Sequence, residues 1–282
     1  MLFYIGYFYR KFVTNAFEIA RPRWAAYRLH LAYVASKLWK SFSWQTFATF
    51  DAITTTEAHY FIRPKTFDAI CASPDYERPD IELTKQLIST QLKRGNTVLY
   101  MDIGANIGCY GIRLANAFRN TSGLSILAYE PYPGSYELLQ KNIMANQLSG
   151  RIKALNLALG DVTGNAQLWI NEKDAGSNSL RPESAAASSA TAPVTVSRLD
   201  DDETAWAARR QATVLFLKLD CEGTEIPVLQ GGQRFLSHSS HVMLMVEDCV
   251  DRQVETFLAQ HQWERFAKLT PYNSFWRKRS AS

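Results

Sequence analysis

Cysteine is scarce in this chain, which has only four cysteines among its 282 residues. None belongs to a Cys-x-x-Cys pair, and they are widely separated: Cys71, Cys109, Cys221 and Cys249. This spacing argues against a disulfide framework and against a zinc site built from thiolates. We therefore expect a protein of a reducing compartment, the cytoplasm.

Long apolar runs are also missing. The chain has no stretch of about 18 uncharged apolar residues, which is the length that a membrane-spanning helix requires. The N-terminus, MLFYIGYFYRK, has no basic residue ahead of its apolar residues and no cleavage site of small residues. The sequence thus predicts neither a transmembrane helix nor a secretory signal.

Acidic residues are nearly absent from residues 1–50, although the whole chain has a net charge of only +4. This segment holds seven Lys or Arg, one Glu and fifteen of the 35 aromatic residues. Apolar residues recur every three or four positions from Trp24 to Leu38, which predicts an amphipathic helix. Two interpretations stay open: the segment covers the main domain, or it binds a membrane surface on the cytoplasmic face or a partner enzyme.

Strand-like and helical patterns alternate from about residue 97. Residues 97–103, 124–130 and 151–159 are apolar runs typical of buried strands, whereas 106–118 and 134–146 carry apolar residues at helical spacing. Strands that are separated by helices are joined by crossovers, and crossovers produce a parallel sheet with helices on its faces.

The second half of the chain continues this sheet. Residues 214–220 and 241–248 are again apolar runs, and 251–261 is helical in pattern. Two closing strands, 263–269 and 274–278, are expected to form an antiparallel pair.

Residues 171–193, NEKDAGSNSLRPESAAASSATAP, are rich in Ser and Ala and have no periodicity. We interpret them as a flexible surface insertion. The predicted fold class is α/β, a mostly parallel doubly wound sheet of the Rossmann-like type. It occupies residues 91–282, behind an aromatic and basic N-terminal helical extension, residues 1–90.

A cluster of small residues follows the first strand, in the stretch DIGANIG. Gly104 and Gly108 allow a tight turn at the carboxyl end of the strand, where ligands gather in open α/β sheets. A dinucleotide site has a second glycine in G-x-G-x-x-G to admit the pyrophosphate, but here that residue is Asn106. The pattern favours a smaller ligand, such as the methionine part of S-adenosylmethionine, and Asp102 either meets its ammonium group or holds the loop.

Glu130 ends the second strand, twenty-eight residues after Asp102. A carboxylate at this position accepts hydrogen bonds from both hydroxyls of a ribose. Together with Asn106, it predicts a ligand that has a ribose but no diphosphate.

Candidate catalytic residues follow the next two predicted strands. Lys218 and Asp220 are two apart on one strand and share a face, Glu222 follows directly, and Glu247 ends the neighbouring strand. An alcohol that attacks a methyl group must lose its proton, so a base is expected within about 3 Å of it. Asp220 is the first choice, followed by Glu222 and Glu247, while Lys218 pairs with a carboxylate or holds the acceptor.

Other polar residues near this site have alternative interpretations. The three carboxylates could hold Mg²⁺, although no histidine accompanies them, and our main prediction contains no metal. Glu225 is expected in the first turn of the next helix, in a structural role. His238 and His241 precede the fifth strand and are expected at the surface, with His241 as an alternative base.

Several of these motifs together resemble the FkbM-type S-adenosylmethionine-dependent methyltransferases. The resemblance runs over residues 97–277 and is carried by MDIGANIG, YEPYPGSYELLQKNIMAN, LNLALGD, SRLDD, FLKLDCEGTEIPVLQGG and MVED. Cys221 stands where a small aliphatic residue is usual, and residues 1–90 lie outside the match. The resemblance implies a Rossmann-like class I methyltransferase fold, S-adenosylmethionine as cofactor and methyl transfer to a hydroxyl, commonly of a sugar.

The expected cofactor-binding residues follow from these motifs. They are Asp102, Gly104, Ala105, Asn106, Gly108, Glu130, Pro131, Ala158 and Asp161. The expected acceptor is a hydroxyl of a sugar in a glycan or in a glycoconjugate, including a lipid-linked one. Two alternatives stay open: O-methylation of a small secondary metabolite, and a non-catalytic protein that binds S-adenosylmethionine or acts as a scaffold.

Nucleic acid is not an expected partner. Enzymes that methylate an extruded base would carry a stretch like N-P-P-Y after the fourth strand, but the sequence there is DCEG. The part of the chain after residue 50 is not strongly basic either.

Overall fold

The structure is a computed structural model that describes residues 50–171, 175–181, 190–238, 241–248 and 253–278. The predicted amphipathic helix and its membrane or partner contacts fall outside these ranges. Within them, no helix combines the length and the apolar character that crossing a membrane requires.

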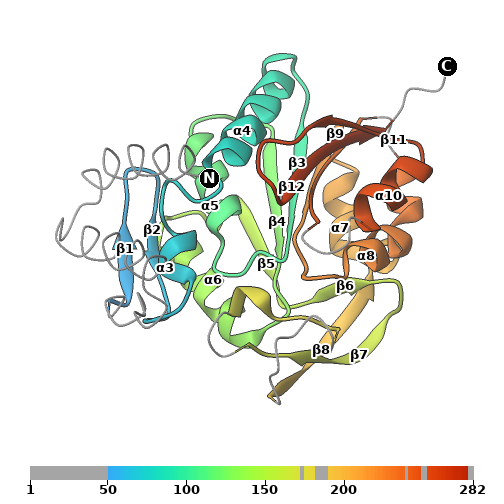
Figure 1. The fold of residues 1–282 in the computed structure, drawn as a ribbon. Coiled ribbons are helices and arrows are strands. Elements are labelled where there is room, and N and C mark those ends of the chain that lie inside the picture. Colours follow the sequence, from blue (N-terminus) through green and yellow to red (C-terminus); the bar gives the residue numbers. More distant parts are fainter. Residues whose placement is uncertain (1–49, 172–174, 182–189, 239–240, 249–252, 279–282) are drawn as a thin grey trace, which may run out of the picture.

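A seven-stranded sheet forms the centre of the molecule (Figure 1), in the order β11-β12-β10-β9-β3-β4-β5. Its strands are β3 Val98–Ile103, β4 Leu124–Tyr129, β5 Ile152–Leu155, β9 Val214–Leu219, β10 Val242–Glu247, β11 Trp263–Ala267 and β12 Asn273–Lys278. β5, β4, β3, β9 and β10 are parallel, whereas β12 pairs antiparallel with both β10 and β11. The predicted fold class and the antiparallel closing pair are therefore confirmed.

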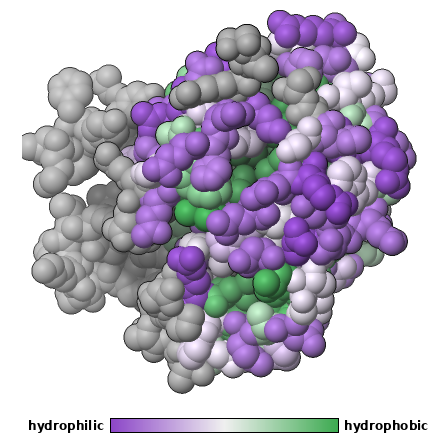
Figure 2. All heavy atoms as spheres, turned by 90° about the vertical axis from the view of Figure 1, so that its right-hand side faces the viewer, coloured by the Kyte–Doolittle hydropathy of each residue, from purple (hydrophilic) through white to green (hydrophobic). Residues whose placement is uncertain are grey.

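Helices cover both faces of the sheet, because successive residues of a strand point to opposite sides. Val98 and Tyr100 of β3 join one apolar cluster with α4 Arg78–Lys93, α5 Cys109–Ala117 and α6 Pro133–Ala145. Leu99 and Met101 join a second cluster on the other face, with α7 Glu203–Arg209, α8 Glu225–Gly231, α9 Gln233–Ser237 and α10 Gln253–Gln260. The outer surface on the side of α8 and α10 is mainly hydrophilic, and apolar residues show only in recesses (Figure 2).

Three consecutive aspartates that follow β8, Asp200 to Asp202, anchor two of these helices, and the first two of them belong to the motif SRLDD. Asp202 caps the start of α7, where its carboxylate accepts hydrogen bonds from the backbone N–H groups of Thr204 and Ala205. The buried carboxylate of Asp200 accepts hydrogen bonds from the N–H groups of Arg234 and Phe235 at the start of α9. Asp200 and Asp202 therefore have a structural role.

The predicted third strand, residues 151–159, is divided. Its first half is β5 of the central sheet, and its second half, β6 Ala158–Gly160, belongs to a small sheet with β7 Gly164–Trp169 and β8 Thr191–Arg198. The side-chain amide of Asn156 at the break donates hydrogen bonds to the backbone oxygens of Glu130 and Pro131, at 2.8 and 2.9 Å. A side chain thus replaces the strand pairing that the apolar pattern predicted.

Part of the predicted flexible insertion, residues 171–193, is packed against the domain. The backbone of Ser179 pairs with that of Trp169 through two hydrogen bonds of 2.8 and 3.1 Å. The hydroxyl of Ser179 also donates to the backbone oxygen of Glu222 at 2.6 Å. The described residues 175–181 are therefore an ordered flap over one end of the sheet, which the Ser and Ala content did not indicate.

The described part of the N-terminal extension begins with a hairpin, β1 Ala52–Thr54 and β2 His59–Phe61, and not with a helix. Asn142 of α6 and Asn146, the residue that caps the end of this helix, hold the hairpin with their side-chain amides. Each amide both donates to and accepts from the backbone, of Phe61 and of His59 respectively, at 2.6 to 3.1 Å. The extension then continues through the short helix α3 Asp68–Cys71 into α4.

Candidate active site

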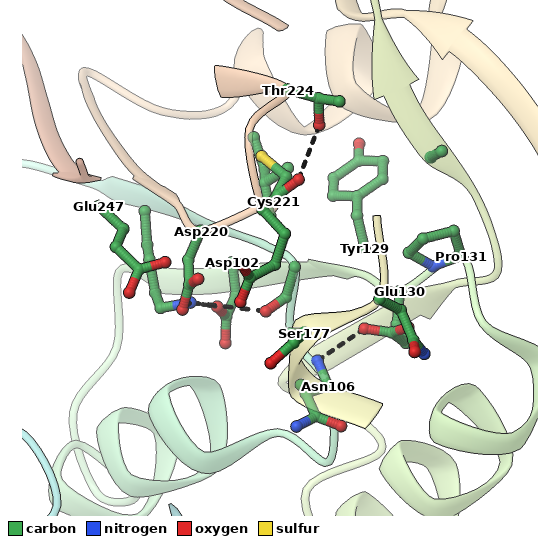
Figure 3. A pocket seen from close by; sticks show the side chains of 18 of the residues that line it. Asp102, Asn106, Tyr129, Glu130, Pro131, Ser177, Asp220, Cys221, Thr224 and Glu247 are labelled. Atoms are coloured by element: carbon green, nitrogen blue, oxygen red, sulfur yellow. Dashed lines mark hydrogen bonds and ion pairs between the residues drawn. The ribbon is translucent and has the colours of Figure 1, made fainter. Parts of the chain in front are cut away.

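The candidate site lies at the carboxyl ends of the central strands. β4 follows β3 on one side of it and β9 lies on the other, so the direction of the chain connections reverses at β3, where open α/β sheets bind ligands. A cavity of about 260 Å³ lies there. Figure 3 shows Glu130 and Pro131 on one side of it and Asp220 and Glu247 on the other.

The loop after β3 is shaped by residues in the left-handed region. Gly104 has φ +79°, and a Cβ there would lie 1.8 Å from the backbone oxygen of Asp220. Asn106 has φ +47°, and its backbone N–H donates to Oε2 of Glu130 at 2.8 Å. The N–H groups of Gly104 and Ala105 donate to the backbone oxygen of Tyr129. The loop is therefore fastened to the ends of both neighbouring strands.

Glu130 is buried and lines the cavity. Its Oε2 accepts the Asn106 N–H, and its Oε1 accepts the N–H of Tyr132 at 2.9 Å. Burial raises the pKa of Glu130 to about 7, against the opposing effect of these two hydrogen bonds and of the Arg63 charge. Each carboxylate oxygen keeps a lone pair for a further donor.

Lys218 is buried between two carboxylates. Its Nζ lies 2.9 Å from Oδ2 of Asp220 and 3.5 Å from Oδ1 of Asp102. Burial acts to lower the pKa of Lys218, but the charges of Asp220 and Asp102 outweigh it and raise the pKa well above its usual value. Oδ2 of Asp102 accepts the N–H of Gly111 in α5 at 3.0 Å. These contacts tie Asp102 to α5 and to Lys218, and because Asp102 also lines the cavity, both roles considered for it stay predictions.

Asp220 is held in its ionised form. Burial acts to raise the pKa of Asp220, but the Lys218 charge and hydrogen bonds with Glu247 and Lys218 outweigh this effect, so the pKa is lowered. The charge of Lys218 is the largest of the effects that lower this pKa. Asp220 is thus a charged acceptor at the wall of the cavity.

Glu222 completes a cluster of three carboxyl groups with Asp220 and Glu247, whose ligand atoms lie within 4.8 Å of one another. Its φ is +53°, and Glu225 supports this turn by accepting the backbone N–H groups of Cys221 and Gly223. Glu225 is the first residue of α8, as predicted, and has a structural role. Clusters of acidic groups are common without an ion, and the comparisons below give the Mg²⁺ alternative no support.

Most of the expected site residues lie together. The cavity is lined by Asp102, Gly104, Ala105, Asn106, Glu130, Pro131, Ala158, Lys218, Asp220, Glu222 and Glu247. Gly108 does not line it but begins α5 at φ +91°, where a Cβ would lie 2.7 Å from Leu139. Asp161 is exposed, directly follows β6 and does not line the cavity, and its expected cofactor contact stays a prediction.

Neither histidine before β10 reaches the cavity. His241 precedes the strand, whereas Glu247 ends it, and six residues at about 3.3 Å each place the two roughly 20 Å apart. The alternative of His241 as a base is therefore wrong. His238 ends α9 and packs its ring edge-on against Trp206.

Several lining residues were not anticipated. Phe67, Cys71 and Tyr76 come from the N-terminal extension, and Ser177 and Leu180 come from the insertion. None belongs to a motif or to a periodic stretch, because chain segments far from the sheet in sequence bring them to the cavity. Their aromatic and small side chains carried no sequence signal of a site.

Known proteins are similar to this chain in sequence. The family described as methyltransferase FkbM domain matches residues 102–271. The methyltransferase sdnD of Sordaria araneosa is 31% identical over 83 residues, which are 29% of this chain and 31% of that protein. This alignment therefore spans about a third of that relative.

Solved structures are similar to it as well. Methyltransferase FkbM from Methylobacillus flagellatus KT has 19% identity and a TM-score of 0.39, over 64% of this chain and 43% of that chain. A methyltransferase from Geobacter sulfurreducens has 14% identity and a TM-score of 0.43, over 75% of this chain and 88% of that chain. The family match covers more than half of the sequence and includes the loop after β3, Glu130, Asp220 and Glu247, so the chain belongs to the FkbM methyltransferase domain family.

Proposed function

We propose that this chain transfers a methyl group from S-adenosylmethionine to a hydroxyl of a sugar in a glycan or glycoconjugate. One observation carries the proposal: a buried carboxylate suited to a ribose, Glu130, and an ionised carboxylate suited to a general base, Asp220, line the same cavity. Family membership supports methyl transfer and the use of S-adenosylmethionine. The sugar acceptor is the substrate class that the resemblance to this family implies.

The residues present fit the cofactor. Glu130 receives backbone donors from Asn106 and Tyr132 and keeps further lone pairs for two ribose hydroxyls. Asn106 occupies the position where a dinucleotide site has the glycine that admits a pyrophosphate, which favours a ligand without one. Pro131 and Ala158 offer apolar contacts on the same side of the cavity.

In the proposed reaction the cofactor supplies the methyl group, and residues of this chain accept the proton and position the reacting groups. When bound, S-adenosylmethionine supplies a sulfonium methyl group, whose bond to sulfur breaks with the electron pair left on sulfur while the acceptor oxygen forms the new C–O bond. Asp220 accepts the hydroxyl proton of the acceptor in this step. Lys218 keeps Asp220 ionised beforehand, and Glu130 orients the ribose so that the reacting atoms are held close.

Isothermal calorimetry tests the cofactor. S-adenosylmethionine and S-adenosylhomocysteine are expected to bind in the micromolar range, and NAD⁺ is expected not to bind. Glu130→Gln changes a residue of the cavity, and Glu137→Gln is its matched control, because Glu137 is exposed on α6. Absence of binding by the wild-type chain would leave only the scaffold alternative or another ligand.

Glycan analysis tests the acceptor. Methyl ethers are measured by mass spectrometry in glycans from cells that express the chain and from cells that express the Asp220→Asn variant. A methyl ether that depends on Asp220 is the expected result. Identical methyl-ether profiles, together with normal cofactor binding, would contradict the glycan acceptor and point to a small metabolite.

A further inference from the structure

One wall of the cavity is used neither by the cofactor residues nor by the proposed base. It contains Phe67, Cys71 and Tyr76, which precede the residues matched by the family, 102–271. These side chains belong to the part of this chain that the family does not describe. They are therefore where a property particular to this protein is expected.

Tyr76 and Phe67 line the same cavity as the proposed base, Asp220. Their two rings pack edge-to-face, at 6.2 Å between centroids and 79° between planes. Burial raises the pKa of Tyr76 well above its ordinary value, so its phenol stays protonated. Two aromatic rings at nearly right angles thus belong to the cavity that holds the proposed base.

The loop that presents Tyr76 is held in a strained conformation. Glu77 has φ +43°, which is unusual for a residue with a side chain. The hydroxyl of Tyr110 donates to the Glu77 carboxylate at 2.6 Å, and Arg113 donates to the backbone oxygens of Pro74 and Tyr76 at 2.8 and 3.1 Å. Strain that the surroundings enforce in this way is typical of functional sites.

Arg63 connects this wall to the cofactor loop. Its guanidinium forms a bidentate ion pair with Asp68, the first residue of α3, with both contacts at 2.7 Å. The same group donates to Oδ1 of Asn106 at 2.8 Å and to the hydroxyl of Ser135 at 2.9 Å. The position of α3 is therefore coupled to the position of Asn106, which in turn binds Glu130.

The aromatic wall and the carboxyl groups that line the same cavity indicate which acceptor fits there. Aromatic faces pack well against the C–H face of a sugar ring, and the carboxyl groups of Asp220, Glu222 and Glu247 accept hydrogen bonds from several hydroxyls. An anionic ring would be repelled by the same carboxyl groups. We propose that Phe67 and Tyr76 form an acceptor subsite for an uncharged pyranose ring, which it holds beside Asp220. This inference rests on the proposed function and names the substrate class of the same site.

Saturation-transfer NMR tests the subsite without requiring turnover. The full chain is first bound to excess S-adenosylhomocysteine. The saturation-transfer signals of the methyl α-pyranosides of glucose, galactose, mannose and rhamnose are then compared with the signal of the anionic methyl glucuronoside. Transfer to the C–H protons of at least one neutral pyranoside is expected, and little transfer to the glucuronoside. The variants Phe67→Leu and Tyr76→Leu, which keep apolar volume but remove a ring, should each weaken the signal by roughly fivefold.

Matched variants make the result specific. Phe67→Tyr and Tyr76→Phe keep a ring and should retain the signal, as should Tyr272→Ala, which removes an aromatic side chain that is 53% exposed and does not line the cavity. Binding of S-adenosylhomocysteine by each variant shows that it is folded.

Three outcomes would overturn the subsite: unchanged signals in both leucine variants, equal signals from the glucuronoside, or no pyranoside signal from wild-type protein that binds S-adenosylhomocysteine. Loss of S-adenosylhomocysteine binding by the wild-type chain is a separate result, because it contradicts the proposed function itself. A leucine variant that fails to bind S-adenosylhomocysteine is set aside. The subsite is then tested by the variant at the same position that keeps a ring, Phe67→Tyr or Tyr76→Phe, and by the comparison of neutral and anionic pyranosides in the wild type.

Discussion

The ammonium group of Lys218 and the carboxylate of Asp220 form an ion pair of 2.9 Å, in which the Lys218 side chain is buried and the Asp220 side chain is 24% exposed. Lys218 belongs to β9 and Asp220 directly follows the last residue of that strand, so the end of one strand delivers both groups to the cavity. The pair keeps a base ionised at the wall of the cavity. A proton acceptor in this state is what methyl transfer to a hydroxyl requires.

Asp220→Asn tests the base directly. Because the amide cannot accept the hydroxyl proton, kcat should fall by about 10²- to 10⁴-fold while the affinity for S-adenosylmethionine changes little. Steady-state kinetics and calorimetry measure the two quantities. Asp51→Asn, an exposed residue just before β1 that does not line the cavity, is the matched control and should behave as wild type. Near-normal turnover of Asp220→Asn would remove Asp220 from the mechanism.

Glu130 predicts a pH dependence of cofactor binding. Its pKa is raised to about 7 by burial, and only the ionised carboxylate accepts hydrogen bonds from both ribose hydroxyls. The ionised fraction falls from about 90% at pH 8 to about 10% at pH 6, so the Kd of S-adenosylmethionine should rise about tenfold over that interval. Calorimetry at several pH values measures this change. If the Kd of the wild type does not change with pH, or if the Kd of Glu130→Gln changes just as steeply, then Glu130 is not the group that controls cofactor binding.

Lys218→Met removes the charge between Asp102 and Asp220. Two buried carboxylates then lack a partner, so the free energy of unfolding should fall by about 3 to 5 kcal/mol. The folded-state pKa of Asp220 is lowered, so the pair stabilises the protein above the unfolded-state pKa and this contribution is lost as the pH falls. In the variant that pKa rises, and the acidic limb of kcat/KM should move to higher pH.

Urea unfolding and a pH profile measure these two effects of Lys218→Met. Lys93→Met, an exposed lysine in the last turn of α4, is the control. An unchanged acidic limb in an active Lys218→Met variant would mean that Lys218 does not act on the base.

Alanine substitutions at two glycines with the same backbone conformation distinguish the cost of backbone strain from the cost of a steric clash. Gly95 and Gly104 have φ of +80° and +79°, but a Cβ at Gly95 meets nothing within 4 Å, whereas one at Gly104 would lie 1.8 Å from the Asp220 backbone oxygen. Gly95→Ala should cost about 1 kcal/mol of unfolding free energy, the penalty of the left-handed region. Gly104→Ala should cost several times more and abolish cofactor binding. Equal losses by urea unfolding would contradict the close approach of the two strand ends.

Removal of divalent cations should leave activity intact. Lys218 already neutralises Asp220, and the hydrogen bond with Glu247 satisfies a second carboxyl group, so the cluster does not need a cation to be stable. The measurement is turnover after exhaustive EDTA treatment, with Mg²⁺ added back to a parallel sample. Activity that disappears with EDTA and returns with Mg²⁺ would restore the metal alternative.

Local pattern determined the central sheet and the residues at its strand ends. The apolar runs that became β3, β4, β9 and β10 are buried from end to end or nearly so, and such strands show their identity through composition alone. Because parallel strands end at one edge, the residues that follow them had to meet there. The order of strands and helices along the chain was therefore enough to place Glu130, Asp220 and Glu247 around one site.

Tertiary contacts decided the rest. The break between β5 and β6 depends on the Asn156 amide, and the N-terminal hairpin depends on Asn142 and Asn146, whose amides take the place of a neighbouring strand. The aromatic wall of Phe67 and Tyr76 depends on hydrogen bonds between segments far apart in the chain. Sequence periodicity reports which face of an element is buried, but it contains no information on which distant side chain will satisfy a given backbone group.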